Sequence, residues 1–214
     1  MLLFGHVGIT LASTALGFRL KDKLSHRIAE GEVVGTSSIG DSSPSNARLY
    51  SKMSFFRSLA NRVDIRFLLV GSMLPDIIDK PVGIYLFRET FSSGRIFSHT
   101  LLFFVLLTFA GLLIKRYSGK TWGVALSFGT FFHLILDQMW HAPKTLLWPI
   151  FGIGFERMET ANWLGNILHA LFEEPEVYVP EIIGFIVLLW FAWELLYHRA
   201  IIRFLKQGRV NYLK

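Results

Sequence analysis

Long apolar runs alternate with charged connections along this chain. Four of these runs approach the length of about 20 residues that an α-helix needs to cross the hydrocarbon of a bilayer. They cover Leu2–Leu20, Thr100–Ile114, Thr121–Met139 and Ile182–Tyr197. The pattern predicts an all-α, polytopic helical membrane protein.

A fifth run, Ile65–Leu86, is interrupted by charged residues and by two prolines. Pro75 cannot donate a backbone hydrogen bond within a helix, and Pro81 disfavours the helical conformation at Lys80. We therefore expect a short or broken helix whose irregular end lines a cavity, where a membrane tolerates such backbone. The prediction is about five spans in a single membrane-embedded domain over residues 1–214.

The connection that follows the first run is polar. Residues at about 30–47 are rich in Gly and Ser, which predicts a flexible loop. Ala47–Arg66 then carries five basic residues among apolar ones such as Phe55 and Phe56. This composition is typical of an amphipathic helix on an anionic membrane surface.

Lys and Arg concentrate in alternate connections. The stretch Arg19–Arg66 holds nine of them, the link around Lys115 holds three, and the tail after Tyr197 holds five. Ala142–Pro180 holds only two, against five Glu. Because basic residues concentrate in cytoplasmic loops, five spans predict an extracytoplasmic N-terminus, a cytoplasmic loop at 30–47 and a cytoplasmic C-terminus.

Composition agrees with a location in the inner (plasma) membrane. The chain is 52% hydrophobic and 18% charged, whereas a soluble domain is about 45–50% apolar and about 25% charged. It has no cysteine, which excludes disulfides and thiolate metal ligands. The net charge of +6 lies in the connections, so we expect membrane lipids rather than nucleic acid as partners.

Three ionisable residues recur at every fourth position within one apolar run: His133, Asp137 and His141. This spacing keeps them on one stripe of a helix. Charged and imidazole groups are costly inside a span and usually face a protein interior or a wet cavity. Imidazole and carboxylate are also ligands that divalent transition metals accept, so the stripe predicts a metal or catalytic site.

Further polar groups fall at the same predicted membrane face. Asp76 and Asp79 share one side of a helix, and Ser98 could cap the helix that His99 enters. Arg95 could clamp a phosphate or a carboxylate through its guanidinium fork. With five spans, seven groups converge at the extracytoplasmic face: His6, Asp76, Asp79, His99, His133, Asp137 and His141. Glu181, which opens the last run on that face, is a further candidate.

Four short motifs, in this order, resemble a family of small membrane-bound, metal-dependent hydrolases, also called LexA-binding, inner-membrane-associated hydrolases. They are GH at Gly5–His6, LPDxxD at Leu74–Asp79, RxxSHT at Arg95–Thr100 and HxxxD at His133–Asp137. The His and Asp set is also similar to zinc-dependent phospholipase C, an all-helical enzyme with a zinc cluster. The resemblance implies a metal-ligand set of His6, Asp76, His99, His133, Asp137 and His141. Family members often carry His-Arg-Gly before the Ser/Thr-His pair, and only Arg95 of that run is present here.

The first functional interpretation is a membrane-bound hydrolase of an ester or phosphoester that uses metal-activated water. Zinc is the expected metal, with manganese or iron as alternatives. Asp76 would bridge two ions or act as general base, Asp79 would orient a ligand, and Arg95 would neutralise charge on the scissile group. An aromatic loop around Trp140 and Trp148 suggests an amphiphilic substrate such as a phospholipid.

Two other interpretations remain open from the sequence. Buried His and Asp residues also occur in ion- or proton-handling transporters, which need a path to both faces. In this chain the inner side offers only Glu194, near the end of the last run. The third interpretation is a non-catalytic membrane regulator whose polar cluster only stabilises helix packing.

Overall fold

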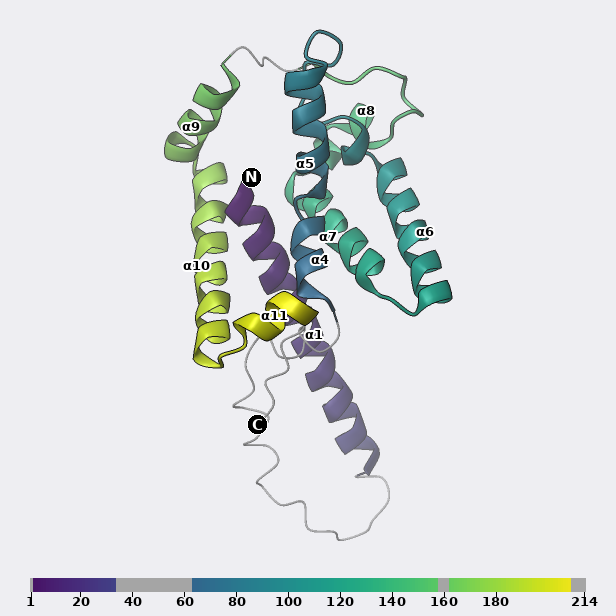
Figure 1. Cartoon of the computed structure of the whole chain (residues 1–214), viewed down its shortest axis with the longest axis vertical. Helices are drawn as coiled ribbons and strands as arrows, with labels where there is room; N and C mark the ends of the chain where they lie inside the picture. The colour runs from purple at the N-terminus through teal and green to yellow at the C-terminus, as the bar shows by residue number, and fades with distance from the viewer. Residues whose placement is uncertain (1, 34–62, 158–161, 209–214) are drawn as a thin grey trace.

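The protein is all-helical over residues 2–33, 63–157 and 162–208, which are the residues that the computed structural model describes (Figure 1). The all-α prediction is therefore confirmed for this part of the chain. The α-helices are α1 (Leu3–Val33), α4 (Ile65–Gly71), α5 (Leu74–Lys80), α6 (Leu101–Ser118), α7 (Trp122–Leu136), α8 (Pro143–Leu146), α9 (Trp163–Glu173), α10 (Pro175–Tyr197) and α11 (Ile201–Gln207). The described residues also form a π-helix, η1 (Pro81–Leu86), and two 3-10 helices, η2 (Phe97–His99) and η3 (Met139–His141).

Within the described residues, three helices are long and apolar enough to cross a membrane: α1 over Leu3–Ser25, α6 and α10. Helix α7 is apolar but has 15 residues. At 1.5 Å per residue it is about 22 Å long, shorter than the hydrocarbon thickness of about 30 Å. The structure thus supports three candidate spans, and the predicted count of about five is not confirmed.

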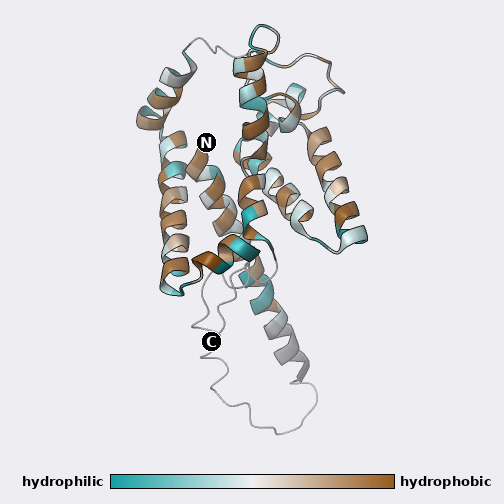
Figure 2. Cartoon of the chain, in the orientation of Figure 1, coloured by the Kyte–Doolittle hydropathy of each residue, from teal (hydrophilic) through white to brown (hydrophobic). Residues whose placement is uncertain are grey.

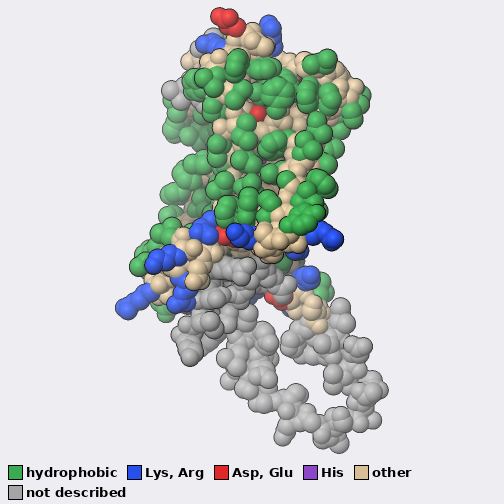
Figure 3. Space-filling model, turned by 45° about the vertical axis from the view of Figure 1, so that its right-hand side comes forward, with side chains coloured by type: hydrophobic (Ala, Val, Ile, Leu, Met, Phe, Trp, Pro, Cys, Tyr) green, Lys and Arg blue, Asp and Glu red, His purple; other side chains and the backbone are tan. Residues whose placement is uncertain are grey.

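The outer surface of the helices is strongly apolar. Helix α6 buries only Gly111 and exposes side chains along its whole length, among them Leu102, Leu106 and Phe109. Apolar colour runs along most of the helices in Figure 2, and apolar side chains form a continuous body in Figure 3. Water-soluble proteins rarely expose apolar patches of this extent, so the surface fits a lipid environment.

The run Ile65–Leu86 is broken, as the prolines predict, into α4, α5 and η1. Pro75 has no N–H to offer the carbonyl of Gly71, four residues earlier. The Gly71 carbonyl instead accepts a hydrogen bond from Thr130 Oγ1 of α7, at 3.2 Å. The break therefore ties α4 to α7 and leaves irregular backbone, at Ser72 and Met73, inside the protein.

Glycines let the helices approach closely. A Cβ added at Gly8 of α1 would overlap the backbone of Gly184 in α10, and one at Gly129 of α7 would overlap the backbone of α4. Small residues at such crossings are typical of helix packing in membranes. A core joins the first half of α1 to α4, α10 and the start of α11, through Leu11, Ala15, Ile65, Leu68, Phe191, Leu195 and Ala200.

Two sequence predictions fall largely outside the described residues. Helix α1 continues to Val33, past the predicted start of the flexible loop, and residues 34–47 are not described. Most of the predicted amphipathic helix Ala47–Arg66 is not described either; its last residues begin α4, where Asp64 caps the N-terminus by accepting from Arg66 N.

Candidate metal centre

Five ionisable side chains from distant parts of the chain meet in the interior. They are His6 of α1, Asp76 of α5, His99 of η2, His133 of α7 and Asp137 just after α7. The three imidazoles are fully buried and the two carboxylates almost so. They form two groups, His6–His133–Asp137 and Asp76–His99–His133, each with ligand atoms within 4.8 Å of one another. His133 belongs to both groups, so the two sets make one centre.

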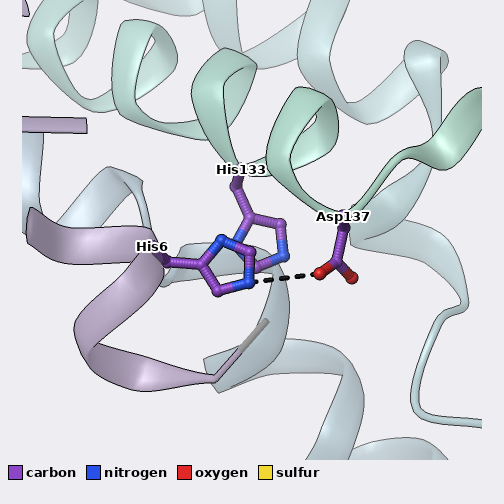
Figure 4. A group of neighbouring side chains, drawn as sticks. All are labelled: His6, His133 and Asp137. Atoms are coloured by element: carbon purple, nitrogen blue, oxygen red, sulfur yellow. Dashed lines mark ion pairs between the residues drawn. The ribbon is translucent and has the colours of Figure 1, made fainter. Parts of the chain in front are cut away.

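The first group brings α1 against the end of α7 (Figure 4). His6 Nε2 lies 3.1 Å from Asp137 Oδ1, and the His6 and His133 rings stack with centroids 4.2 Å apart. Asp137 N still donates to the His133 carbonyl, at 2.9 Å. This last helical hydrogen bond keeps both side chains of the HxxxD motif on the same side of the chain.

The second group is built around two imidazole nitrogens that face each other. The Nε2 atoms of His99 and His133 lie 3.2 Å apart. His133 Nδ1 is 2.7 Å from the Ser72 carbonyl oxygen, and His99 Nδ1 is 2.7 Å from Asp79 Oδ2. Because both partners accept only, each Nδ1 carries the hydrogen, and in the neutral rings each Nε2 presents a lone pair. Two such lone pairs need a proton or a metal ion between them.

Asp76 completes the second group. Its Oδ1 lies 3.6 Å from His99 Nε2 and 3.9 Å from His133 Nε2. These separations are too long for hydrogen bonds, so Oδ1 shares a small central space with both imidazoles. Its other oxygen, Oδ2, accepts from Lys80 Nζ at 2.6 Å.

Asp79 lies behind the centre rather than in it. Its fully buried carboxylate accepts from the backbone nitrogens of Ile96, Ser98 and His99, at 2.7–3.2 Å, besides binding His99 Nδ1. One carboxylate thus fixes the backbone of η2 and the orientation of its imidazole. A carboxylate that holds the far nitrogen of a histidine in this way is typical of metal sites.

Arg95 and Lys80 are partly exposed cations that contact the carboxylates of the centre. Arg95 Nε lies 3.0 Å from Asp137 Oδ2, and Asp137 Oδ2 in turn lies 3.8 Å from His99 Nε2. The side chain of Arg95 is 39% exposed and that of Lys80 is 29% exposed, whereas every imidazole of the centre is fully buried. Each cation therefore connects a buried carboxylate with the outside.

The structure does not bring His141 to the centre. Helix α7 ends at Leu136, and Gln138 adopts a left-handed conformation with φ of 51°. The chain therefore leaves the helical path before a third turn could align His141 with His133 and Asp137. His141 is exposed, and its Nε2 accepts from Trp140 Nε1 at 3.1 Å. The HxxxD pair is thus all that this stripe contributes to the cluster.

The cap of α6 also differs from the expectation. Thr100, not Ser98, caps the helix by accepting from Phe103 N. Ser98 instead donates its hydroxyl to the Pro75 carbonyl, at 3.0 Å. His99 consequently precedes the helix and is held in a short 3-10 turn against α5.

Glu181 has a role that the sequence did not reveal. It accepts from the backbone nitrogens of Leu2, Phe4 and Gly5, at 2.6–3.0 Å, and so caps the N-terminus of α1 from α10. A carboxylate at a helix N-terminus also interacts favourably with the helix dipole. The acidic residue at the start of an apolar run was the available signal, but its partner on a distant helix was not.

Comparison with known proteins identifies the family. The chain belongs to the YdjM inner membrane protein family, whose model matches residues 1–205. No curated protein and no solved structure matches the chain. Family membership and the apolar helices agree with a location in the inner membrane.

Proposed function

Starting from this inner membrane family, we propose that the protein is a metal-dependent hydrolase that acts on an ester or phosphoester. The observation that carries the proposal is the pair of Nε2 atoms of His99 and His133, 3.2 Å apart with both Nδ1 atoms already donating. Two nitrogens bound to one tetrahedral zinc ion at about 2.0–2.1 Å would be about 3.3 Å apart. The observed spacing fits that arrangement.

His6 supports the same conclusion. Its Nδ1 and Nε2 are buried, and neither makes an aligned hydrogen bond to any described residue, although Nε2 contacts Asp137 Oδ1. Leaving a polar nitrogen buried without a partner costs about 1–3 kcal/mol. Coordination of a cation by His6 would remove that cost and would explain why an imidazole occupies this position between two glycines.

His6, Asp76, His99, His133 and Asp137 would hold one or two divalent ions. Imidazole with carboxylate suits zinc, with manganese or iron as alternatives. When bound, such an ion would lower the pKa of water from 15.7 to about 7 and polarise the ester. Zinc is the first choice because three of the five ligands are imidazoles.

The side chains of the centre would then have separate roles in proton transfer, charge stabilisation and orientation. Asp76 would help to hold a second ion or, with a single ion held by the other four residues, would accept the proton of the attacking water, since its Oδ1 faces the two imidazoles. As the ester bond breaks, that proton would pass from Asp76 to the leaving oxygen. Arg95 would stabilise the negative charge that develops on the scissile group, and Asp79 would keep His99 oriented.

The substrate would be amphiphilic and would reach the site from the outer membrane face. Lys and Arg side chains form a band at the lower end of the apolar body, with a smaller group at its upper tip, and α5 lies in the upper half (Figures 1 and 3). Basic bands mark the cytoplasmic side. Beside His99, Phe97 packs against Trp148 and Phe155, with ring centroids 5.4 and 5.0 Å away, and Ile150 and Ile153 nearby in sequence are exposed. An aromatic and apolar mouth of this kind favours lipids.

The experiment is an assay of the detergent-purified protein against matched series of carboxyl esters and phosphoesters. Chelation should abolish hydrolysis, zinc or manganese should restore it, and Asp76→Asn should lose at least about a hundredfold in rate. His141→Asn, at a histidine outside the centre, is the matched control and should keep the rate. A protein that binds metal but hydrolyses no member of either series would favour the regulator over the enzyme.

A further inference from the structure

Two partly exposed cations contact the carboxylates of the candidate metal centre. Lys80 Nζ binds Asp76 Oδ2 at 2.6 Å, and Arg95 Nε binds Asp137 Oδ2 at 3.0 Å. The two carboxylates approach the same atom, His99 Nε2, to 3.6 and 3.8 Å. Each cation therefore binds a carboxylate that also lies near His99 Nε2. Lys80 thus pairs with Asp76, four residues earlier, and not with its neighbour Asp79.

Both cations have N–H donors that bind no acceptor among the described residues. Within the described residues, Arg95 uses only Nε of its guanidinium, and its two terminal nitrogens bind no protein acceptor. Lys80 gives one of its three hydrogens to Asp76. Both side chains are also partly exposed. A guanidinium fork and an ammonium thus remain available to a group that enters from outside.

The number of donors on Lys80 and Arg95 indicates which substrate group they can bind. A carboxyl ester is uncharged and presents a single carbonyl oxygen, which one donor satisfies. A phosphoryl group has three non-bridging oxygens, which can meet a metal ion, a fork and an ammonium at once. Lys80 and Arg95 already balance Asp76 and Asp137, so the doubly charged form of a phosphate monoester would offset the charge of a divalent ion bound at the centre.

We propose that Lys80 and Arg95 form an oxyanion-binding pair that selects a phosphoryl group, so that the substrate is a phosphoester rather than a carboxyl ester. This inference rests on the proposed hydrolase function and narrows it to one substrate class. It assigns Lys80 a role in substrate binding, and it makes Arg95 a specificity determinant.

The test is calorimetric titration of inorganic phosphate into the detergent-purified, metal-loaded full chain. Lys80→Gln and Arg95→Gln should each weaken binding on the order of tenfold to a hundredfold, because each removes a charge-assisted contact. Lys144→Gln and Arg157→Gln are matched controls, since both side chains are exposed in the 142–180 connection. The controls should change the affinity by less than about twofold.

The metal content of each variant is measured in the same preparation. Equal phosphate affinity in all four variants would overturn the inference, and so would a wild-type protein that holds metal but binds no phosphate. Loss of metal from the Lys80 or Arg95 variants would also overturn it, because these cations would then only support the ligands. A wild-type protein without metal contradicts the proposed hydrolase, and the phosphate titration then decides the inference by itself.

A second arm distinguishes a lipid phosphate from a free one. Dioctanoyl phosphatidic acid in neutral detergent carries the same phosphoryl group on an apolar body. Binding at least about tenfold tighter than inorganic phosphate, with the same loss in Arg95→Gln, indicates a lipid substrate. Equal affinities indicate a soluble phosphoester.

Discussion

At the scale of single residues, the acceptors bound by Nδ1 of His99 and of His133 determine which nitrogen of each ring is available as a ligand. Ser72 O and Asp79 Oδ2 hold the two hydrogens, so both Nε2 atoms turn their lone pairs inward. The sequence predicts the imidazoles and carboxylates, because ionisable groups stand out in apolar runs. It cannot predict the Ser72 carbonyl, which every residue type possesses. It also misplaces His141, because nothing in the local pattern marks the left-handed turn at Gln138.

Asp79→Asn tests whether this carboxylate supports a metal ligand. The amide cannot accept from His99 Nδ1 and from three backbone nitrogens with the strength of a carboxylate. We expect metal affinity to fall about ten- to a hundredfold, measured by competition with a chelator of known affinity. Asp64→Asn is the control, since Asn is an equally good N-cap for α4. Unchanged affinity in Asp79→Asn would show that the carboxylate serves the fold alone.

At the scale of elements, helix α1 carries His6 to a centre whose other members lie on α5, on η2, on α7 and just after α7. Two features of α10 hold α1 in place, the Glu181 cap at its N-terminus and the close crossing at Gly8 and Gly184. Proline and apolar length predict the broken helix and the main apolar helices. Contacts between helices that are far apart in sequence, such as the contact of Glu181 with α1, could not be predicted, because no pattern in the sequence around either partner marks them.

Gly8→Ala tests the crossing of α1 and α10. The added Cβ would overlap the Gly184 backbone, and such overpacking costs about 1–3 kcal/mol. We expect a lower melting temperature in detergent. Gly17→Ala is the control on the same helix, because its Cβ meets open space and Ala favours the helix by up to about 1 kcal/mol. Equal melting temperatures for the two variants would contradict the packing described.

Glu181→Gln tests the cap. The neutral amide loses the interaction of the carboxylate with the N-terminus of α1, and we expect destabilisation by about 1 kcal/mol in thermal unfolding. Glu176→Gln removes the same charge from an exposed position in the first turn of α10 and should have little effect. If both variants melt alike, Glu181 does not anchor α1.

At the scale of the whole molecule, the protein has an apolar body with a band of Lys and Arg side chains at its lower end (Figure 3). The sequence predicts the segregation of charge, because Lys and Arg fall in alternate connections. The predicted count of about five spans is not confirmed, since α7 is short and α4, α5 and η1 together replace one continuous helix. Apolar runs indicate burial in lipid or in protein, and only the packing separates the two.

Cysteine accessibility tests the orientation, and the chain offers a clean background because it has no cysteine. Gly154→Cys, in the connection after α8, should react with an impermeant maleimide added outside intact cells. Ser118→Cys, at the exposed end of α6 beside Lys115 and Arg116, should react only after the membrane is opened. The opposite labelling would place the centre on the cytoplasmic side.

The central claim is that His6, Asp76, His99, His133 and Asp137 hold a metal ion. The most direct measurement is the metal content of the detergent-purified protein, wild type beside His133→Asn, Asp137→Asn and the control His141→Asn. We predict near-stoichiometric zinc, manganese or iron in the wild type and in His141→Asn, and loss of that metal in the other two variants. Folded wild-type protein that takes up no metal after reconstitution, or variants that retain it, would contradict the account.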